Sequence, residues 1–250
     1  MSKTRVAALI IGRAGSTGFK NKNLHHVKGR PLMHYSLMAA LNSKYIDKVY
    51  FSSDSNEMKQ EAQKLGAYLI DRPDELATKA ALAEDAFQHG YFEIKKKEGE
   101  IEIFVPLFAN GATITPGILD EGIEFLRQNP SYDSAVTVSE YNMFSPLRAK
   151  KLEDGLVKPF VPLDQFEDAT CDRSSQGDCY FVDCSGFVVR SVCMEGFDYG
   201  EPPFRWIGKK VHPLMQWGGI DVDFEWQLGQ LNFWLDKHGF SEESTPYDIK

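Results

Sequence analysis

The chain has 250 residues, of which 42% are hydrophobic and 26% are charged, and this size and composition predict one large soluble α/β domain. Its formal net charge of −8 at pH 7 disfavours nucleic-acid binding. No apolar run approaches the ~20 residues of a membrane span, and the N-terminus lacks a secretory pattern, so we expect a cytoplasmic protein with no membrane partner.

The charge is distributed unevenly along the chain. Residues 1–46 hold eight Lys or Arg and no Asp or Glu, whereas the remaining residues carry 20 basic and 36 acidic side chains. A local cationic segment on an anionic protein indicates that a small polyanion binds at one place.

Strand and helix patterns alternate along most of the chain, which predicts a mainly parallel sheet covered by helices on both faces. Ligands of such sheets bind beyond the carboxyl ends of the strands. The expected strands are residues 4–12, 47–53, 67–70, 101–107 and 134–139, and the expected helices are one that opens at Pro31, one that ends near Leu65, 79–96, 116–128 and one in the tail.

The alternation of strands and helices breaks between residues 142 and 190, where prolines and three of the four cysteines lie. We interpret this segment as an extended arm or β insertion within a single domain of residues 1–250. The four cysteines do not form the two closely spaced pairs of a structural zinc site, which favours reduced thiols over a metal knuckle.

The loop at residues 12–23 follows the first expected strand and is rich in glycine, hydroxyl and basic residues. Gly12, Gly15 and Gly18 let the backbone approach a ligand closely, and successive N–H groups can form an anion nest. Nearby side chains add charge or hydrogen bonds, namely Arg13, Ser16, Lys20 and Lys22. The spacing matches neither the P-loop nor the dinucleotide glycine pattern, so a purely structural strand–helix turn remains the alternative.

Several ordered motifs resemble the acid-sugar cytidylyltransferases of the acylneuraminate type. That family begins with a strand, then Pro-Ala-Arg-Gly-Gly-Ser-Lys-Gly and, a few residues on, Lys-Asn. The matching positions here are Arg13, Gly15, Ser16, Gly18, Lys22 and Asn23, followed by Gly29–Leu32, Val49–Asp54, Gly66-Ala67, Arg72–Ala77 and an Asp-x-Asp in the tail. The resemblance implies a nucleotide-diphospho-sugar-transferase-like, three-layer α/β fold and a homodimer.

The resemblance also implies a reaction, in which an acceptor oxygen attacks the α-phosphate of CTP and pyrophosphate leaves. Catalysis of this kind rests on positioning and charge neutralisation by Mg²⁺ and basic side chains. Lys22, Arg13 and Asp221 are therefore the expected catalytic residues. The expected nucleotide-binding residues are Gly12, Arg13, Gly15, Ser16, Thr17, Lys22, Asn23 and Arg72.

Asp221 and Asp223 are the candidate metal ligands. On an extended segment, side chains two positions apart point to the same side, so both carboxylates can face one cation. Mg²⁺ favours one or two carboxylates together with phosphate oxygens and water. The alternative is a solvent-exposed turn without a metal, but the family that the chain resembles has an Asp-x-Asp at this point, which favours the metal site.

Two departures from the family pattern bear on the acceptor. Thr17 stands where the family has a lysine, so one cation is missing unless Lys20 supplies it. The family's mid-chain Gln-Pro-Thr-Ser-Pro-Leu-Arg is replaced by residues 106–116, in which Asn110 is the candidate acceptor ligand. The arm offers further candidates for gripping an acidic acceptor, of which Arg148, Arg173 and Gln176 are the main ones, although a solvated charged arm is an equal alternative.

The acceptor closest to the resemblance is a nonulosonic or other 3-deoxy-2-keto acid sugar. A phosphonate or phosphate acceptor is the alternative within the enzyme class, because residues 106–116 and Thr17 depart from the pattern. A nucleotide-binding paralogue without catalysis is the alternative outside that class; Thr17 favours it, whereas Lys22 and the acidic pair argue against it.

Overall fold

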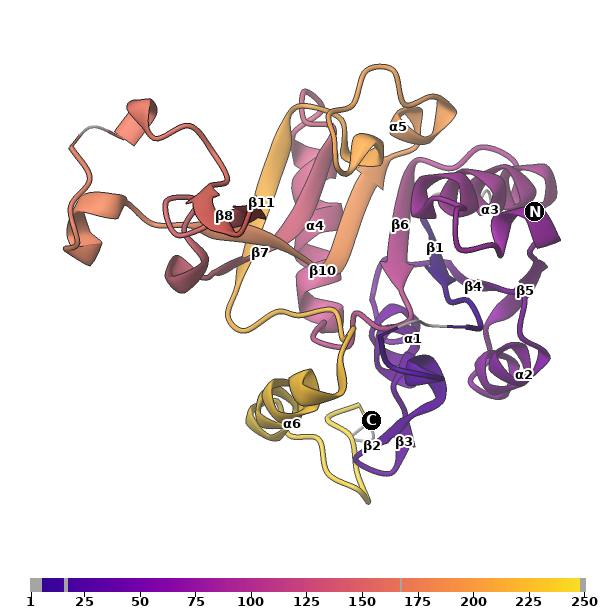
Figure 1. Cartoon of the computed structure of the whole chain (residues 1–250). Helices are drawn as coiled ribbons and strands as arrows, with labels where there is room; N and C mark the ends of the chain where they lie inside the picture. Colours follow the sequence, from indigo (N-terminus) through magenta and orange to yellow (C-terminus); the bar gives the residue numbers. More distant parts are fainter. Residues whose placement is uncertain (1–5, 16–17, 167, 248–250) are drawn as a thin grey trace.

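The computed structural model describes residues 6–15, 18–166 and 168–247 (Figure 1). Within these residues, seven strands form one sheet in the order β11-β7-β10-β6-β1-β4-β5. Neighbouring strands are parallel, except that β10 runs antiparallel to β6 and β7. The strands are β1 (Val6–Ile11), β4 (Lys48–Ser53), β5 (Tyr68–Asp71), β6 (Ile103–Phe108), β7 (Ser134–Glu140), β10 (Tyr180–Arg190) and β11 (Val211–Gln216). The predicted mainly parallel, three-layer fold is confirmed.

Helices cover both faces of this sheet (Figure 1). α1 (Met33–Leu41), α2 (Asn56–Lys64) and α4 (Pro116–Gln128) pack on one face, and α3 (Ala83–Glu98) and α5 (Val192–Glu195) pack on the other. α6 (Leu228–Lys237) packs beside the small hairpin of β2 (His26–Val27) and β3 (Arg30–Pro31). The 3₁₀ turns are η1 (Lys22–Leu24), η2 (Asp74–Leu76), η3 (Asn142–Phe144), η4 (Asp164–Phe166), η5 (Arg173–Gln176), η6 (Arg205–Ile207) and η7 (Glu225–Gln227).

β1 forms the centre of the molecule because its apolar run is continuous. All six of its residues are buried, with Ala8 and Ile10 in the core beneath α1, α2 and α4, and Ala7 and Leu9 in the core beneath α3. A strand that alternated polar and apolar residues could serve only one of these two cores. The continuous run therefore places the loop after β1 at the middle of the carboxyl edge of the sheet.

Two helix starts follow local capping rules. The Ser55 hydroxyl accepts a hydrogen bond from the Met58 N–H at 3.3 Å and caps α2. Thr115 caps α4 in the same way, with Pro116 at the first helical turn. The predicted helix at Pro31 instead begins at Met33, because Pro31 pairs with His26 in the β2–β3 hairpin.

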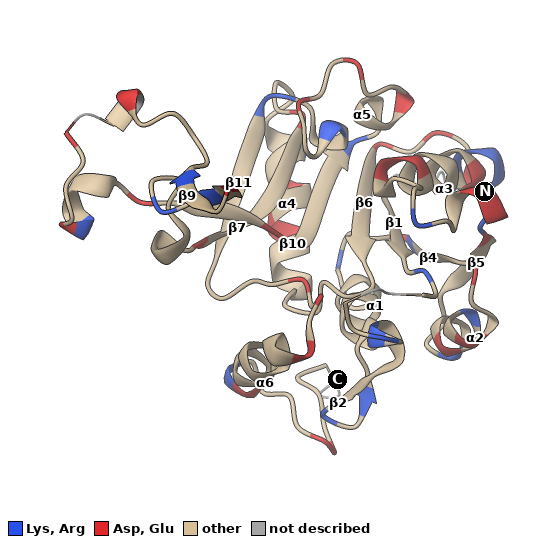
Figure 2. Cartoon of the chain, in the orientation of Figure 1, with Lys and Arg blue, Asp and Glu red and all other residues tan. Residues whose placement is uncertain are grey.

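The arm differs from the prediction at its C-terminal end. Residues 180–190 form β10, a central strand of the sheet, so only the part before Tyr180 projects from the sheet edge (Figure 1). The projecting part contains a hairpin of β8 (Lys150–Glu153) and β9 (Leu156–Pro159), on which Figure 2 shows basic positions. Large apolar side chains are exposed on and beside the hairpin, including Leu152, Val157 and Phe160.

None of the helices within the described residues combines the length and apolar character needed to cross a bilayer. The four cysteines are free thiols, ranging from the exposed Cys171 to the buried Cys193.

Candidate active site

A cavity of about 500 Å³ opens at the carboxyl edge of the sheet, beyond β1 and β6. It joins three segments that are distant in sequence: the glycine-rich loop, the stretch from β5 into α3, and the acidic tail segment. Its lining residues are Ile11, Gly12, Arg13, Gly18, Lys22, Asn23, Arg72, Leu76, Ala81, Leu82, Ala83, Ala86, Phe108, Asn110, Asp223 and Phe224. The predicted phosphate loop and half of the predicted acidic pair therefore line the same cavity.

The glycine-rich loop is pressed against the acidic segment. A Cβ atom at Gly18 would lie 2.8 Å from the carbonyl oxygen of Asp223, so only glycine fits at this crossing without movement of the backbone. On the other side of the loop, the Ala14 N–H donates to Asp54 Oδ1 at 2.9 Å. These contacts hold the loop between the end of β4 and the tail.

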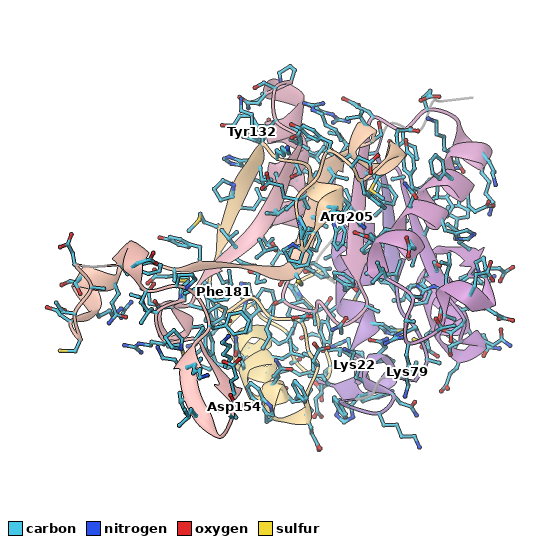
Figure 3. All side chains as sticks on the ribbon, turned by 45° about the horizontal axis from the view of Figure 1, so that its top comes forward. Lys22, Lys79, Tyr132, Asp154, Phe181 and Arg205 are labelled. Carbon is cyan, nitrogen blue, oxygen red and sulfur yellow. The ribbon has the colours of Figure 1, made fainter. Side chains whose placement is uncertain are left out.

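Lys22, which is labelled in Figure 3, lies at the start of η1, and its ammonium group contacts Asp223 of the acidic segment. The ammonium group forms an ion pair with Asp223 Oδ1. The Lys22 side chain is 13% exposed and that of Asp223 is 53% exposed, so the pair lies at the mouth of the cavity. A cation already occupies one face of the acidic pair.

Asn23 is buried behind Lys22, with 6% of its surface exposed. Its Oδ1 atom has no hydrogen-bond partner among the described residues. Buried polar atoms of this kind are rare and costly, and one that lines a cavity is suited to a donor group on a ligand.

Two arginines face the cavity from different elements. Arg72, which follows β5, is buried, and its Nη2 atom donates to the carbonyl oxygen of Ser52 at 2.8 Å. Burial lowers the pKa of Arg72 to about 10, which leaves the guanidinium charged at neutral pH. The Arg13 Nη1 atom donates to the carbonyl oxygen of Thr78 at 2.7 Å, across the chain that leads to α3.

Asp221 and Asp223 flank Val222, which is fully buried. The Val222 N–H donates to the carbonyl oxygen of Asn110 at 3.0 Å, and Asn110 Nδ2 donates to the carbonyl oxygen of Val222 at 3.1 Å. This pairing turns Val222 inward. Asp223 is exposed and lines the cavity, whereas Asp221 is half-buried and is not among the lining residues. Burial, and after it the negative charge of Asp223, raises the pKa of Asp221 to about 6.

Asp221 and Asp223 are the residues that could hold a divalent cation at this site. Two carboxylates that repel each other favour a bound cation, and the Lys22 ammonium already serves as a counter-ion for one of them. The described residues contain no group of three or more His, Cys, Asp or Glu suited to a metal ion. Mg²⁺ is commonly bound by one or two protein carboxylates and takes its remaining ligands from phosphates and water, so this pair fits its coordination preference.

The remaining predicted residues lie elsewhere. Gly15 is exposed on the outer part of the loop, and Ser16 and Thr17 lie outside the described residues. Arg148 and Arg173 line a separate hollow of about 280 Å³ on the arm.

In that hollow, the Arg173 Nη2 atom lies 3.1 Å from Glu140 Oε1. Gln176 turns back to the arm, where its Nε2 atom donates to the carbonyl oxygen of Thr170 at 3.0 Å. Of the four predicted acceptor ligands, only Asn110 reaches the main cavity within one chain, and there its amide also lies 3.4 Å from Asp223 Oδ1.

The sequence prediction missed the apolar end of the cavity. Leu76 and the stretch Ala81–Ala83 enter it from the approach to α3, and Phe108 and Phe224 enter it from the ends of β6 and the acidic segment. Small and apolar side chains at helix starts are common, so they carried no signal of their own. The positions of the two phenylalanines, next to Asn110 and Asp223, were the available clue.

The sheet topology and the cavity beyond its carboxyl edge define an α/β protein of the nucleotide-diphospho-sugar transferase type. A solved structure of CMP:2-keto-3-deoxy-manno-octonic acid synthetase complexed with CTP has the same fold, with a TM-score of 0.66, 14% identity, and coverage of 93% of this chain and 99% of that chain. Residues 7–159 match the cytidylyltransferase family, and the chain therefore belongs to that family.

Curated relatives carry the acid-sugar names that the motifs predict. The N-acylneuraminate cytidylyltransferase of Escherichia coli is 37% identical over 162 residues, which are 65% of this chain and 38% of that protein. The corresponding protein of Oncorhynchus mykiss is 26% identical over 245 residues, 94% of this chain and 53% of that protein.

A third relative, from Helicobacter pylori, is a pseudaminic acid cytidylyltransferase and UDP-2,4-diacetamido-2,4,6-trideoxy-beta-L-altropyranose hydrolase. It is 31% identical over 157 residues, 62% of this chain and 30% of that protein. The chain thus spans between about a third and half of the length of these relatives. The predicted resemblance to acylneuraminate-type enzymes is confirmed.

Proposed function

We propose that this chain transfers CMP from CTP to an acidic acceptor and releases pyrophosphate. The observation that carries the proposal is the convergence of the basic loop and Asp223, one member of the acidic pair, at one cavity, where Lys22 and Asp223 form an ion pair. The names of the curated relatives and the CTP bound to the structural neighbour support the choice of nucleotide.

The two ends of the cavity suit the two ends of a nucleotide. Ala81, Leu82 and Ala83 form an apolar end at the start of α3, where first-turn N–H groups have no partner within the helix. A flat base with ring acceptors fits this end, with the buried guanidinium of Arg72 beside it. The triphosphate then extends toward the cationic end at Arg13 and Lys22.

In the proposed step, an acceptor oxygen forms a bond to the α-phosphorus of CTP. The bond from that phosphorus to the bridging oxygen breaks, and pyrophosphate leaves with the electron pair while the acceptor's hydroxyl proton passes to water. Lys22 faces the position where negative charge gathers on the phosphates, and preorganised cations at such a position lower the barrier. Arg13 contributes a second cation from the same loop.

Asp221 and Asp223 would hold Mg²⁺ at this end of the cavity. When bound there, Mg²⁺ neutralises charge on the phosphate oxygens. The Lys22 side chain must then exchange part of its contact with Asp223 for a contact with phosphate, which a lysine on a flexible four-carbon stem can do.

The acceptor is most simply a nonulosonic or other 3-deoxy-2-keto acid sugar, as the relatives' names suggest. One observation keeps a phosphonate or phosphate acceptor as a second candidate. In the segment that replaces the family's acceptor motif, Asn110 and Thr113 hold the backbone of Val222 and Ile220, and so serve the acidic segment. A non-catalytic paralogue is disfavoured because the charged groups needed for transfer converge at one cavity.

We also propose a homodimer. The apolar side chains of Leu152, Val157 and Phe160 are exposed on the arm, and burying them against a second copy would be favourable. In such a dimer, we propose that Arg148 and Arg173 of one copy bind the acidic acceptor beside the other copy's cavity.

The test is pyrophosphate release in the presence of Mg²⁺, with CTP, UTP, ATP and GTP compared across 2-keto acid sugars and small phosphonates. Release that depends on CTP and on one acceptor class is expected. Binding of CTP without release for any acceptor in the panel would contradict the transfer reaction and favour a binding-only protein.

A further inference from the structure

Asp183 is a buried carboxylate in the interior next to the acidic segment, and only 6% of its surface is exposed. It lies in β10, where the pairing with β7 is irregular between Val182 and Phe187. The following residue, Cys184, has a left-handed backbone with a φ of 60°. Such irregularities often redirect a side chain next to an active site, and their strain points to a function.

Four donors surround the Asp183 carboxylate. On Oδ1 they are the Thr137 hydroxyl at 2.6 Å and the Ser185 N–H at 3.1 Å. On Oδ2 they are the Ser139 hydroxyl at 2.7 Å and Gln216 Nε2 at 2.9 Å. Each carboxylate oxygen accepts two hydrogen bonds, and an amide could not replace the carboxylate because its NH₂ group would face two of the donors.

Two of these donors lead directly to the acidic segment. Gln216 is the last residue of β11, at the start of the connection to Asp221. The Ser139 hydroxyl gives its single proton to Asp183, so its lone pair faces the Gly219 N–H, which donates to it at 2.9 Å. The Asp183 carboxylate thereby fixes the direction of the hydroxyl that holds Gly219.

Gly219 also packs closely against Asp183. A Cβ atom at this position would lie 2.1 Å from Asp183 Oδ2, so the segment passes directly over the carboxylate. On the far side, the Tyr141 hydroxyl donates to the carbonyl oxygen of Gly219 at 2.9 Å, and the Ile220 N–H donates to Thr113 Oγ1 at 2.8 Å. The backbone just before Asp221 is thus held from several sides, with Asp183 beneath it.

We propose that Asp183 is a positioning residue: it fixes residues 216–220 so that Asp221 and Asp223 face one cation. This inference rests on the metal role proposed above for the acidic pair. Both oxygens of Asp183 accept hydrogen bonds from protein donors, so the proposal gives Asp183 no direct contact with substrate or metal. Removing a residue that orients metal ligands commonly weakens metal binding by about 10–100-fold.

The chain offers matched controls. Asp120 is 8% exposed and accepts hydrogen bonds from the Ser43 hydroxyl at 2.5 Å and the Lys44 N–H at 3.0 Å, on α4. Ser134 is fully buried in β7, as Ser139 is, and its hydroxyl donates to the carbonyl oxygen of Ile207. Asp120→Asn and Ser134→Ala therefore remove comparable buried groups without touching the acidic segment.

The experiment measures Mn²⁺ binding by electron paramagnetic resonance, with a non-reacting α,β-methylene analogue of CTP present, together with amide exchange and urea unfolding. Asp183→Asn is expected to weaken Mn²⁺ binding by about tenfold or more. Ser139→Ala is expected to weaken it by a smaller factor, and both variants should speed amide exchange at residues 218–222. Asp120→Asn and Ser134→Ala should leave both readings at wild-type values.

Asp221→Asn separates the two claims. If this variant binds Mn²⁺ as the wild-type protein does, the metal role of the acidic pair is refuted, and the positioning role falls with it. If Asp221→Asn loses Mn²⁺ but Asp183→Asn and Ser139→Ala match their controls, only the positioning role is refuted. Ser139→Ala decides the matter if Asp183→Asn fails to fold.

Discussion

Lys22 and Asp223 lie 201 positions apart in sequence, yet they form an ion pair at the mouth of the cavity. Lys22 belongs to the basic opening segment and Asp223 to the acidic tail. Their pairing offsets the charge of both groups, and it brings a cation and a candidate metal ligand to the same point. A triphosphate with its metal would engage both groups at once.

Replacing Lys22 with Gln removes the cation proposed to stabilise the phosphates. We expect kcat/KM for CTP to fall by about 10²–10³-fold, because preorganised charge is a large part of such catalysis. Stability should change by about 1 kcal/mol or less, because the pair lies at the surface. Steady-state kinetics and thermal unfolding check both points.

The control for this substitution is Lys28→Gln. Lys28 also belongs to the basic opening segment and also forms an ion pair, with its Nζ atom 2.6 Å from Asp236 Oδ1. The kcat/KM of Lys28→Gln for CTP should remain near the wild-type value. Equal losses in the two variants would show that the general positive charge of the segment, and not the position of Lys22, is what matters.

Asp221 should make the metal-free protein less stable as the pH rises. Its pKa is raised from 3.8 to about 6, so between these values the folded protein keeps a proton that the unfolded chain releases. The stability contribution is therefore full below pH 4 and is lost as the pH rises through 6. In EDTA, Asp221→Asn should exceed the wild-type stability by about 1–3 kcal/mol at pH 7.5 and match it near pH 4.

Urea unfolding at the two pH values measures this difference. The variant should gain stability and lose Mg²⁺-dependent turnover at the same time, as expected of a carboxylate kept for function. A variant that is clearly less stable than the wild-type protein at pH 7.5 would show that Asp221 is held by contacts other than a bound cation.

Arg72 should contribute to nucleotide affinity as well as to folding. Arg72→Met removes a buried guanidinium beside the proposed base end, and we expect the KM for CTP to rise by about 10–100-fold. Arg190→Met provides the comparison, because Arg190 is partly buried and its Nε atom donates to the carbonyl oxygen of Tyr132 at 2.8 Å. Arg190→Met should lower stability and leave KM unchanged, and a similar rise in KM for both variants would argue against a nucleotide contact.

The arm should control the oligomeric state. Val157 in β9 and Val192 in α5 are similarly exposed, at 68% and 65%. Val157→Asp is expected to convert a dimer to a monomer, because it places a charge in the proposed apolar interface. Val192→Asp should remain dimeric. Light scattering after size-exclusion chromatography gives the mass, and a monomeric wild-type protein at micromolar concentration would rule out the dimer.

Much of the fold follows from the sequence because its strands carry strong local signals. The continuous apolar run of β1, the end of α2 near Leu65 and the bounds of α4 agree with the prediction. The prolines and cysteines of residues 142–190 predict an arm, and Asp183, Cys184 and Ser185 weaken the strand signal of β10 within it. β11 was missed because His212 and Pro213 weaken its strand signal.

The site was predictable only in its parts. The basic loop and the Asp-x-Asp spacing each indicated a function, but no local pattern shows that Lys22 meets Asp223 or that Asn110 pairs with Val222. β11 is an edge strand, with β7 and β10 between it and β6, so those contacts arise because the chain after β11 returns along the carboxyl edge of the sheet to the loops after β1 and β6. The role of Asp183 was hidden for the same reason, because its partners come from three strands.

The most direct test of the proposed reaction is ³¹P nuclear magnetic resonance of CTP incubated with the protein, Mg²⁺ and an acid sugar such as N-acetylneuraminic acid or pseudaminic acid. The CTP signals should be replaced by those of pyrophosphate and a single CMP phosphodiester, and Asp221→Asn and Lys22→Gln should slow this change strongly. A phosphonate acceptor would instead give the two coupled signals of an anhydride. CTP that stays unchanged with every acceptor, or that is converted to free CMP at the same rate with and without an acceptor, would contradict the proposed transfer.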